Sequence, residues 1–434
     1  MNKRATGRMQ PGRFLCAIAA MCSLSACAPA SFDDAQGSGP RSNFTQTGET
    51  TSEVISALME RRSLLAEDSV YEQVATAAIS ASSRAAEAEL ISAKLRAEAA
   101  SKNWFPTLGP SVSLTDLGDL VAGLLIEQVL FDNGRRKAER EFAAADVEVA
   151  AVSLSQDMNS RVETAVGLYA AALRGDEKAA YGDRALRRMQ EFRRIVQGRV
   201  DGGVSDRADL NVVDSKISGI RTAAATARDA ATTARAELHA MTGQSFDQKP
   251  SHLSIGTPPE QGQFLSVLKA GAEAERTIAQ AKSGRAGLLP QISAAGNVTT
   301  DGSGAGVTLG TGQPLGLGTP AAIQALEASK EAAKRQVGEA EEAARRAYSR
   351  QVQQIASYQR QEGETSALVR RSRETYELFQ KQFEAGQRPV MEVIQVYEEL
   401  VRREQAYIDA KFEVVLIQLE LARDLGLLAD GDKI

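Results

Sequence analysis

The chain has 434 residues, of which 43% are hydrophobic but 5% aromatic, and its 51 Lys and Arg against 56 Asp and Glu give a net charge of −5. So few aromatic side chains would make poor cores for two or three globular domains, and the acidic balance argues against nucleic acid as a partner. Neither His239 nor His252 lies in a nucleophile or metal motif, and the three cysteines form no cluster. We therefore expect no enzyme and no metal or other cofactor.

Residues 1–26 have the pattern of an export signal, with basic residues before a short apolar run that ends at Leu24. The next residues, Ser25-Ala26-Cys27, complete a segment that resembles the lipobox of bacterial lipoproteins. That resemblance implies cleavage before Cys27 and acylation of its thiol and amine, and Ala28 in place of an aspartate implies the outer membrane. An ordinary signal peptide with a chance cysteine is the alternative. Residues 27–50 are polar and are predicted to form an acylated, solvated leader.

Proline spacing predicts very long helices, because proline costs about 3 kcal/mol inside a helix. No proline lies between Pro110 and Pro250, between Pro320 and Pro389, or after Pro389. We expect long helices at 135–200 and 320–384, each roughly 100 Å long at about 1.5 Å per residue. Shorter helices are expected at 206–242 and 389–427.

Apolar periodicity supports these helices. One run recurs every three or four residues: Val147, Ala151, Leu154, Met158, Val162, Ala165, Tyr169 and Ala172. A stricter run alternates steps of three and four, as in a heptad seam: Leu210, Val213, Ile217, Ile220, Ala224, Ala227, Ala231, Ala234, Leu238 and Met241. Adding 183 to this seam gives apolar positions throughout 393–421 except Arg403.

The chain is predicted to be an internal duplication, because landmarks recur at a nearly constant spacing. Pro106 matches Pro290 and Gly134 matches Gly318 at 184 residues, while Gly203 matches Gly386 and Gly243 matches Gly426 at 183. We expect a first repeat at 51–243, a linker at 244–257, a second repeat at 258–428 and a tail at 429–434. Each repeat would run helix, two strands, very long helix, tight turn and shorter helix.

The predicted strands alternate apolar and small polar residues. In 107–115 one face carries Leu108, Pro110, Val112 and Leu114, and in 291–299 the matching face carries Ile292, Ala294, Gly296 and Val298. Such strands suit a transmembrane barrel, with a soluble hairpin as the alternative. Turns are expected at 116–119 and 301–304, giving hairpins at about 107–131 and 291–315. The faces of the second strands, 120–131 and 305–313, cannot be assigned, since one is apolar throughout and the other rich in glycine. Trp104, just before the first strand, is a candidate interface anchor.

Four strands cannot close a barrel, and an open edge in lipid would leave unpaired amides that cost several kcal/mol each. Two chains would supply eight strands, whose interior is filled by side chains, and three chains would supply twelve around an open lumen.

The lipobox, the duplication, the hairpin before Phe131-Asp132-Asn133-Gly134 and the glycine turns together resemble the TolC family of outer-membrane channel proteins. The resemblance covers about 50–428. It implies a mainly α fold with a small β part: a homotrimer whose twelve-stranded β-barrel in the outer membrane continues as a periplasmic α-barrel. It also implies two further partners, a periplasmic adaptor protein and an inner-membrane ABC or proton-driven pump.

In this family the helix-tip turns carry a glycine followed six residues later by an acid and an aliphatic residue, and adaptors grip these tips. The matching positions here form the predicted docking set: Gly203, Asp209, Leu210, Gly386, Glu392 and Val393. Plain hairpin turns are the alternative, with the glycines supplying positive φ and Pro389 opening the next helix.

The second tip also resembles the periplasmic gate of the family. Phe383 and Arg388 match the family's aromatic and arginine, Glu392 takes the first acidic position, and Gln395 replaces the second aspartate. The position aligned with the partner of the arginine is Ser218, with Asp214 one turn away. A ring of three Glu392 would bind cations, whereas a solvated turn charge is the alternative.

The substrate is not determined by these residues. The tip Ala385-Gly386-Gln387-Arg388-Pro389 is more similar to members that serve type I protein secretion than to drug-efflux members. A different class also fits the helices, namely a lipid-anchored coiled-coil spacer without a pore. The duplicated hairpins favour the channel.

Overall fold

The computed structural model describes residues 52–433 with gaps at 83–84, 115–119, 249, 251–254, 257–261 and 300–301. Residues 1–50 form a separate unit, so the predicted signal peptide, Cys27 and the leader lie outside the described residues. The predicted turn at 116–119 also falls in a gap.

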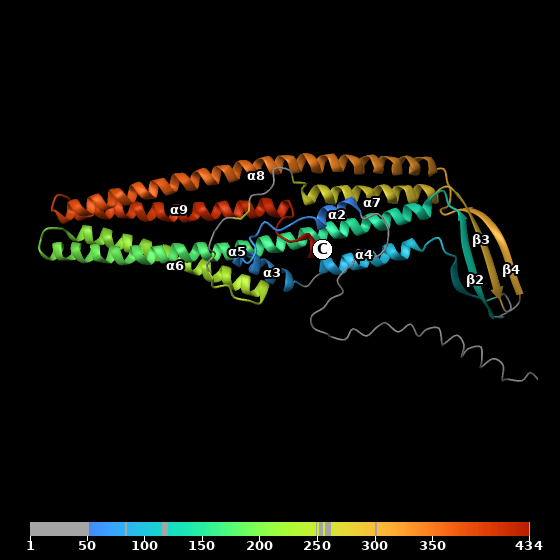
Figure 1. The fold of residues 1–434 in the computed structure, drawn as a ribbon, viewed down its shortest axis with the longest axis horizontal. Helices are drawn as coiled ribbons and strands as arrows, with labels where there is room; N and C mark the ends of the chain where they lie inside the picture. The colour runs from blue at the N-terminus through green and yellow to red at the C-terminus, as the bar shows by residue number, and fades with distance from the viewer. Residues whose placement is uncertain are drawn as a thin grey trace, which may run out of the picture. The chain divides into compact units, whose positions relative to one another are not determined.

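The predicted class, mainly helical with a small β part, is confirmed (Figure 1). In chain order the elements are α2 (Glu53–Met59), α3 (Val70–Ser80), α4 (Ala85–Ser101), β1 (Thr107–Leu114), β2 (Leu120–Phe131), α5 (Arg135–Asp201), α6 (Arg207–Thr242), α7 (Leu265–Gly287), β3 (Pro290–Thr299), β4 (Gly302–Thr311), α8 (Thr319–Glu384), α9 (Val390–Asp424) and the short 3₁₀ helix η2 (Gly431–Lys433). Among the described residues no helix is both long and apolar enough to cross a membrane.

The order α4-β1-β2-α5-α6 recurs as α7-β3-β4-α8-α9. The spacing is 184 residues for the first strands, but α5 ends at Asp201 and α8 at Glu384, which is 183. The match of Gly134 with Gly318 is therefore wrong, and Gly134 corresponds to Leu317. The backbone agrees, because Gly134 has a left-handed φ of 83° while Gly318 has φ −82°.

The helices α5 and α6 form one antiparallel hairpin, and the predicted seam is its contact surface. Val213, Ile217, Ala224, Ala231 and the other seam residues from 213 to 238 are all buried. The two backbones approach closely where glycines of α5 meet alanines of α6. A Cβ added at Gly175 would lie 2.6 Å from the carbonyl oxygen of Ala227, and one at Gly182 would lie 2.7 Å from the Cβ of Ala224. Small side chains thus set the spacing of this hairpin.

Replacing Gly175 with alanine is expected to destabilise the protein by about 1–3 kcal/mol, because the added methyl group has no room and overpacking costs this much. The matched control is Gly198→Ala in the same helix, where no atom lies within 4 Å of the added Cβ. That change should be neutral or stabilising by up to about 1 kcal/mol, since alanine favours helix over glycine. Thermal unfolding followed by circular dichroism measures both, and equal melting temperatures would contradict the close contact.

The second hairpin, α8–α9, is packed differently. The predicted seam in α9 is part of a wider buried face, since α9 also buries Ile394, Tyr397, Ile408, Phe412 and Leu419. This face contacts both α8 and α5, so α9 joins the two hairpins. In α8, by contrast, five of 66 residues are buried. The rest of α8 leaves a long surface without a partner in the single chain.

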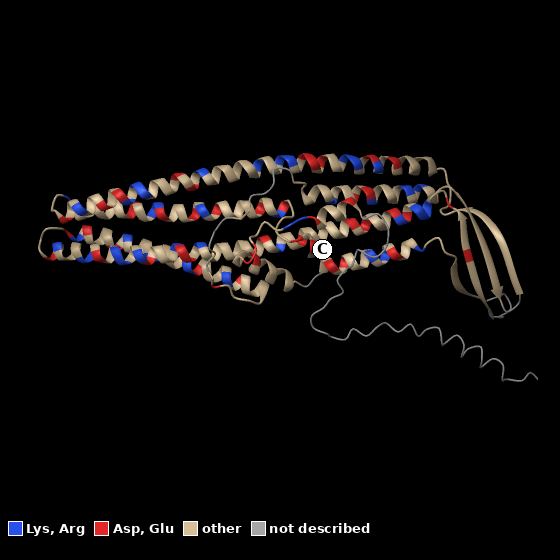
Figure 2. Cartoon of the chain, viewed as in Figure 1, with Lys and Arg blue, Asp and Glu red and all other residues tan. Residues whose placement is uncertain are grey.

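The four strands form one antiparallel sheet in the order β1-β2-β3-β4 at the end of the helices opposite the tips (Figure 1). The predicted turn at 301–304 is wrong, because β4 begins at Gly302 and its residues pair directly with β3. The tighter connection accounts for the loss of one residue in the second repeat. Glu127 is the single charged residue in the four strands as described, which Figure 2 shows as an isolated red band on the sheet.

The strand register assigns the faces of β2 and β4, which sequence patterns alone could not. Leu108 is paired with Ile126 and Pro110 with Leu124, so the even residues of β2 share the apolar face of β1. In the other hairpin Ile292 is paired with Leu309 and Ala294 with Val307, so the odd residues of β4 join the same face. A bulge at 129–131 then brings Phe131 opposite Ile292. One face is therefore apolar throughout, and the other carries small and polar residues.

Candidate functional site at the helix tips

The two helix tips have the same backbone geometry. Gly203 has φ 72° and Gly386 has φ 73°, the left-handed region that was predicted for both. After each glycine the chain reaches back into the finished helix: the amide of Val204 donates to the carbonyl of Arg199 at 2.8 Å, and that of Gln387 to the carbonyl of Gln382 at 2.8 Å. These are Schellman turns, which satisfy the last helical carbonyls and reverse the chain in few residues.

The next helix begins differently at the two tips. Asp206 caps α6, because its carboxylate accepts bonds from the amides of Ala208 and Asp209. In the second tip Pro389 is the N-cap of α9, with extended ψ 144°, and not the first-turn residue that was predicted. Its fixed φ of −70° fits that position without cost.

The predicted docking residues fall into exposed and buried groups. Asp209 lies in the first turn of α6 and accepts a hydrogen bond from the Ser205 hydroxyl at 2.9 Å. Leu210 is half-buried, and Val393 is fully buried between the helices. In this conformation Val393 therefore supports the tip from inside and presents no surface to a partner.

Arg388 is the centre of a small cluster at the second tip. Its Nη1 is 2.5 Å from a carboxylate oxygen of Glu392, its Nε donates to Gln382, and its guanidinium carbon lies 3.8 Å from the centre of the Phe379 ring. The side chain of Arg388 is 33% exposed and that of Glu392 is 45% exposed. The second tip thus carries a neutralised, half-exposed Arg–Glu pair stacked on an aromatic ring.

The partner expected from the family alignment is different here. Asp214 accepts two bonds from Arg193 of the same hairpin, at 2.5 and 3.3 Å. This hydrogen bonding and the attraction to Asp214 raise the pKa of Arg193. Ser218 donates to the backbone carbonyl of Asp214 at 2.9 Å. Arg388 is bonded within its own hairpin in the single chain.

Of the other predicted gate residues, Phe383 packs partly buried against the apolar cluster of the tips, and Gln395 is exposed on α9. Phe379 and Gln382 were not predicted from the sequence. Both precede Arg388 by six or more residues across the turn, so no helical spacing links them. An aromatic residue one turn inside α8 was the available signal.

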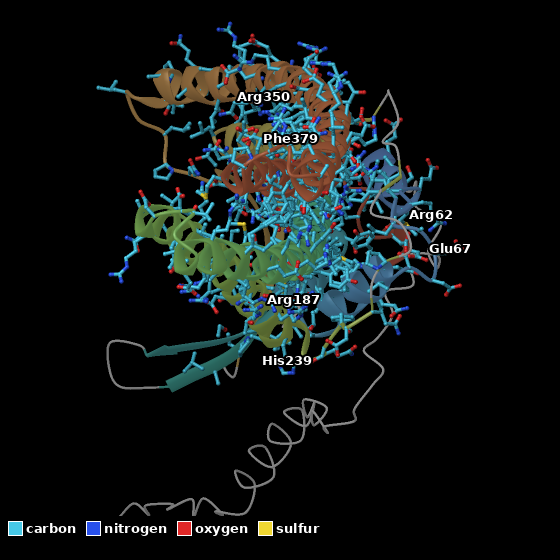
Figure 3. All side chains as sticks on the ribbon, turned by 90° about the vertical axis from the view of Figure 1, so that its left-hand side faces the viewer. Arg62, Glu67, Arg187, His239, Arg350 and Phe379 are labelled. Carbon is cyan, nitrogen blue, oxygen red and sulfur yellow. The ribbon has the colours of Figure 1, made fainter. Side chains whose placement is uncertain are left out.

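A single apolar cluster, here called the tip cluster, joins the two hairpins behind the turns. It combines residues from all four long helices: Met189, Phe192 and Val196 of α5, Val213, Ile217 and Ile220 of α6, Val369 and Tyr376 of α8, and Val390, Val393, Ile394, Tyr397, Leu400 and Val401 of α9. The Tyr397 ring lies 4.9 Å from that of Tyr376 and 5.8 Å from that of Phe192, between centroids. Burial raises the pKa of Tyr397 to about 12, so the ring stays neutral. Figure 3 looks onto the tips, with Arg187 marking the first hairpin and Phe379 the second.

Polar contacts between the hairpins concentrate on α5 and α9. Three ion pairs of alternating sign lie close together: Arg174–Glu413 at 3.0 Å, Glu177–Lys411 at 2.6 Å and Lys178–Asp409 at 2.8 Å. Nearer the tips the Nε of Arg188 donates to the Tyr376 hydroxyl at 2.7 Å, and Lys216 pairs with Glu398. The middle of the unit is therefore held by charges and the tips mainly by the apolar cluster.

The sheet presents an exposed apolar surface. Leu108, Val112, Val298, Val307 and Leu309 share one face and are each more than half exposed. A patch of this kind marks an interaction surface. Among the described residues no group of three or more His, Cys, Asp or Glu side chains is placed to hold a metal ion.

Comparisons with known proteins agree on one family. The family model described as outer membrane efflux protein matches residues 75–244 and 263–427. No curated protein matches the chain.

Solved structures show the same fold at low identity. The outer membrane protein VceC of Vibrio cholerae is 14% identical with a TM-score of 0.72, covering 82% of this chain and 96% of its own. A membrane protein from Pseudomonas aeruginosa is 16% identical with a TM-score of 0.71, covering 83% and 91%. The MtrE outer membrane channel of Neisseria gonorrhoeae, in its open state, is 16% identical with a TM-score of 0.68, covering 89% and 95%.

Proposed function

Because the chain belongs to the outer membrane efflux protein family, we propose that it is the exit duct of a tripartite export system. Three copies form a channel in the outer membrane whose helices extend into the periplasm. A periplasmic adaptor protein docks on the helix tips, and an inner-membrane ABC or proton-driven pump delivers the substrate. The chain acts as a channel and carries out no catalysis.

The observation that carries this proposal is the sheet. One face is apolar and exposed, the other is small and polar, and both edge strands lack a second neighbour. In lipid such a sheet needs its edges paired, and three copies supply twelve strands around a lumen lined by the polar face. Family membership supports the same assembly.

The tips are proposed to serve the adaptor and the gate. Gly203 and Gly386 shape the turns, and Asp209, Leu210 and Glu392 present side chains at their surface. Val393 supports them from the tip cluster. Phe383, Arg388, Glu392 and Gln395 form the constriction, with the three Arg388–Glu392 pairs arranged around one axis.

Assembly and conduction test the proposal. The purified protein should have the mass of a trimer by light scattering, migrate as a heat-modifiable trimer on a gel, and conduct ions in planar bilayers. A monomeric rod that is extracted without breaking a barrel and conducts nothing would favour the lipid-anchored spacer instead.

The substrate is proposed to be a secreted protein rather than a small toxic compound, because the tip from Ala385 to Pro389 is more similar to type I secretion members. Neighbouring genes test this choice. An ABC transporter with an adaptor and a repeat-rich exported protein supports secretion, and a proton-driven pump supports drug efflux.

The chain is also proposed to be anchored by acyl groups on Cys27. Cys27→Ser should abolish metabolic labelling with palmitate, because a hydroxyl does not replace the thiol in thioether formation. The control Ser25→Ala, in the same segment, should keep its label. Label that persists on the serine variant would exclude the lipoprotein.

A further inference from the structure

The sheet has two open edges, β1 and β4, and β4 is exposed along almost its whole length. Each edge carries a row of backbone N–H and C=O groups without partners, which lipid does not tolerate. The proposed trimer places β4 of one copy beside β1 of the next. It does not by itself say which residues meet.

The internal duplication supplies a template for this junction. Within one chain, β2 is the second strand of the first repeat and pairs with β3, the first strand of the second repeat. Between chains, β4 is the second strand of the second repeat and meets β1, the first strand of the first repeat. In a barrel of six similar hairpins the two junctions are equivalent.

The two hairpins of one chain fix the correspondence of residues. The pair Leu108–Ile126 in the first hairpin corresponds to the pair Ile292–Leu309 in the second. First strands are thus related by 184 residues and second strands by 183. Applied to the pair Ile126–Gly296 of the β2–β3 junction, these spacings give Leu309 opposite Val112.

We propose that β4 of one copy pairs antiparallel with β1 of the next in this register, an inference that rests on the proposed trimer. Leu309 lies opposite Val112 of the next copy, Gly310 opposite Ser111 and Thr311 opposite Pro110. Pro110 has no N–H, so the ladder lacks one donor at that position.

The chemistry of the side chains supports the register independently, because side-chain type was not used to derive it. Leu309 and Val112 both lie on the apolar face and are 74% and 68% exposed in the single chain. Gly310 and Ser111 both lie on the small polar face. A slip of one residue would put Leu309 opposite Ser111 and break the apolar surface at the junction. A slip of two residues would keep the faces, so the duplication is what selects between these.

Paired cysteines test the register directly. Directly opposite residues have Cβ atoms about 4.5–5.5 Å apart, while diagonal neighbours two residues away are about 7–8 Å apart. The double variant Leu309→Cys/Val112→Cys, oxidised in isolated outer membranes, should give covalent dimers and trimers on a denaturing, non-reducing gel. We expect at least tenfold more product than from Leu309→Cys/Pro110→Cys or Leu309→Cys/Ser111→Cys, the two slipped pairs.

Two controls make the result interpretable. Each single cysteine variant reports any background from the natural cysteines. The intrachain pair Ile126→Cys/Gly296→Cys has the corresponding register, so its linkage, read by mass spectrometry, shows that the oxidant reaches this geometry.

The outcomes separate this inference from the proposed function. Strongest linkage in a slipped pair would overturn the register while leaving the trimer intact. Intrachain linkage with no interchain linkage, in a protein that still has the mass of a trimer, would overturn the β4–β1 junction. A protein that is monomeric by light scattering would instead overturn the proposed function.

Discussion

Replacing Arg388 with serine is expected to raise single-channel conductance in planar bilayers and to increase the preference for cations. In each copy Arg388 neutralises Glu392 at 2.5 Å and rests on Phe379. A half-exposed ion pair contributes about 0.2–1 kcal/mol and a cation–aromatic contact about 0.5–1 kcal/mol. Each loss occurs three times around the axis, and three uncompensated carboxylates then repel one another. A few kcal/mol in total can shift a closed tip towards open.

The complementary variant separates charge from shape. Glu392→Ala leaves three uncompensated guanidinium groups, so cation preference and block by multivalent cations should both fall. The double variant should return the ion preference towards neutral. Cells with Arg388→Ser should also admit large antibiotics that the wild type excludes.

A matched control lies on the preceding helix, far from the tip. Arg345 pairs with Glu341 across one turn of α8 at 3.8 Å, and both side chains are at least half exposed. Arg345→Ser should leave conductance unchanged. If Arg388→Ser and Glu392→Ala also leave conductance and cation block unchanged, these residues do not form the constriction and the tip is a docking surface alone.

Replacing Phe192 with alanine is expected to destabilise the tips by about 3–5 kcal/mol per chain, the usual cost of deleting a buried phenylalanine ring. Phe192 is 2% exposed and contacts Tyr397, so it links the first hairpin to the second. The loss should be local, because the ion pairs between α5 and α9 and the sheet lie outside the tip cluster. Hydrogen exchange should therefore accelerate in 185–220 and 369–401 and stay unchanged in the strands.

The control for this change is Leu378→Ala, which removes an apolar side chain that is 54% exposed on α8 close to Tyr376. It should change stability by less than about 0.5 kcal/mol. The docking proposal adds a second readout, since adaptor binding should weaken with Phe192→Ala although Phe192 itself is buried. Uniformly faster exchange along the whole chain would show that the tips and the sheet unfold together.

The helices could be predicted from the sequence because their pattern is local. The seam residues from Val213 to Leu238 follow strict heptad spacing, and all of them are buried as that spacing requires. The left-handed turns at Gly203 and Gly386 were predictable for the same reason, since a tight turn needs positive φ and glycine provides it.

The sheet could be predicted only in part, because faces and register depend on pairing between strands. In β2, Leu124, Leu125 and Ile126 are all apolar, so alternation carries no information there. The partner strand resolves the ambiguity. The duplication was found from glycine matches, yet Gly134 and Gly318 do not correspond, since identical residues at a plausible spacing do not establish the same backbone conformation.

The site residues were predicted from single positions, whereas their contacts are made across the turn. Arg388 and Glu392 are one helical turn apart and meet as an i,i+4 pair would. Phe379 belongs to the preceding helix, so its place beneath Arg388 depends on how sharply the turn closes. Val393 continues the seam into the tip cluster, which explains why it is buried and not displayed.

The two hairpins are equal in length almost to the residue, with 67 and 66 residues in α5 and α8 and 36 and 35 in α6 and α9. Helix length is thus a ruler that sets the reach of both tips from the sheet. Removing seven residues from both arms of both hairpins would keep every seam in phase and shorten that reach by about 10 Å. Shortening one hairpin alone would leave its tip a full step behind its neighbour, so the reading of the ruler has to change twice in the gene to change once in the protein.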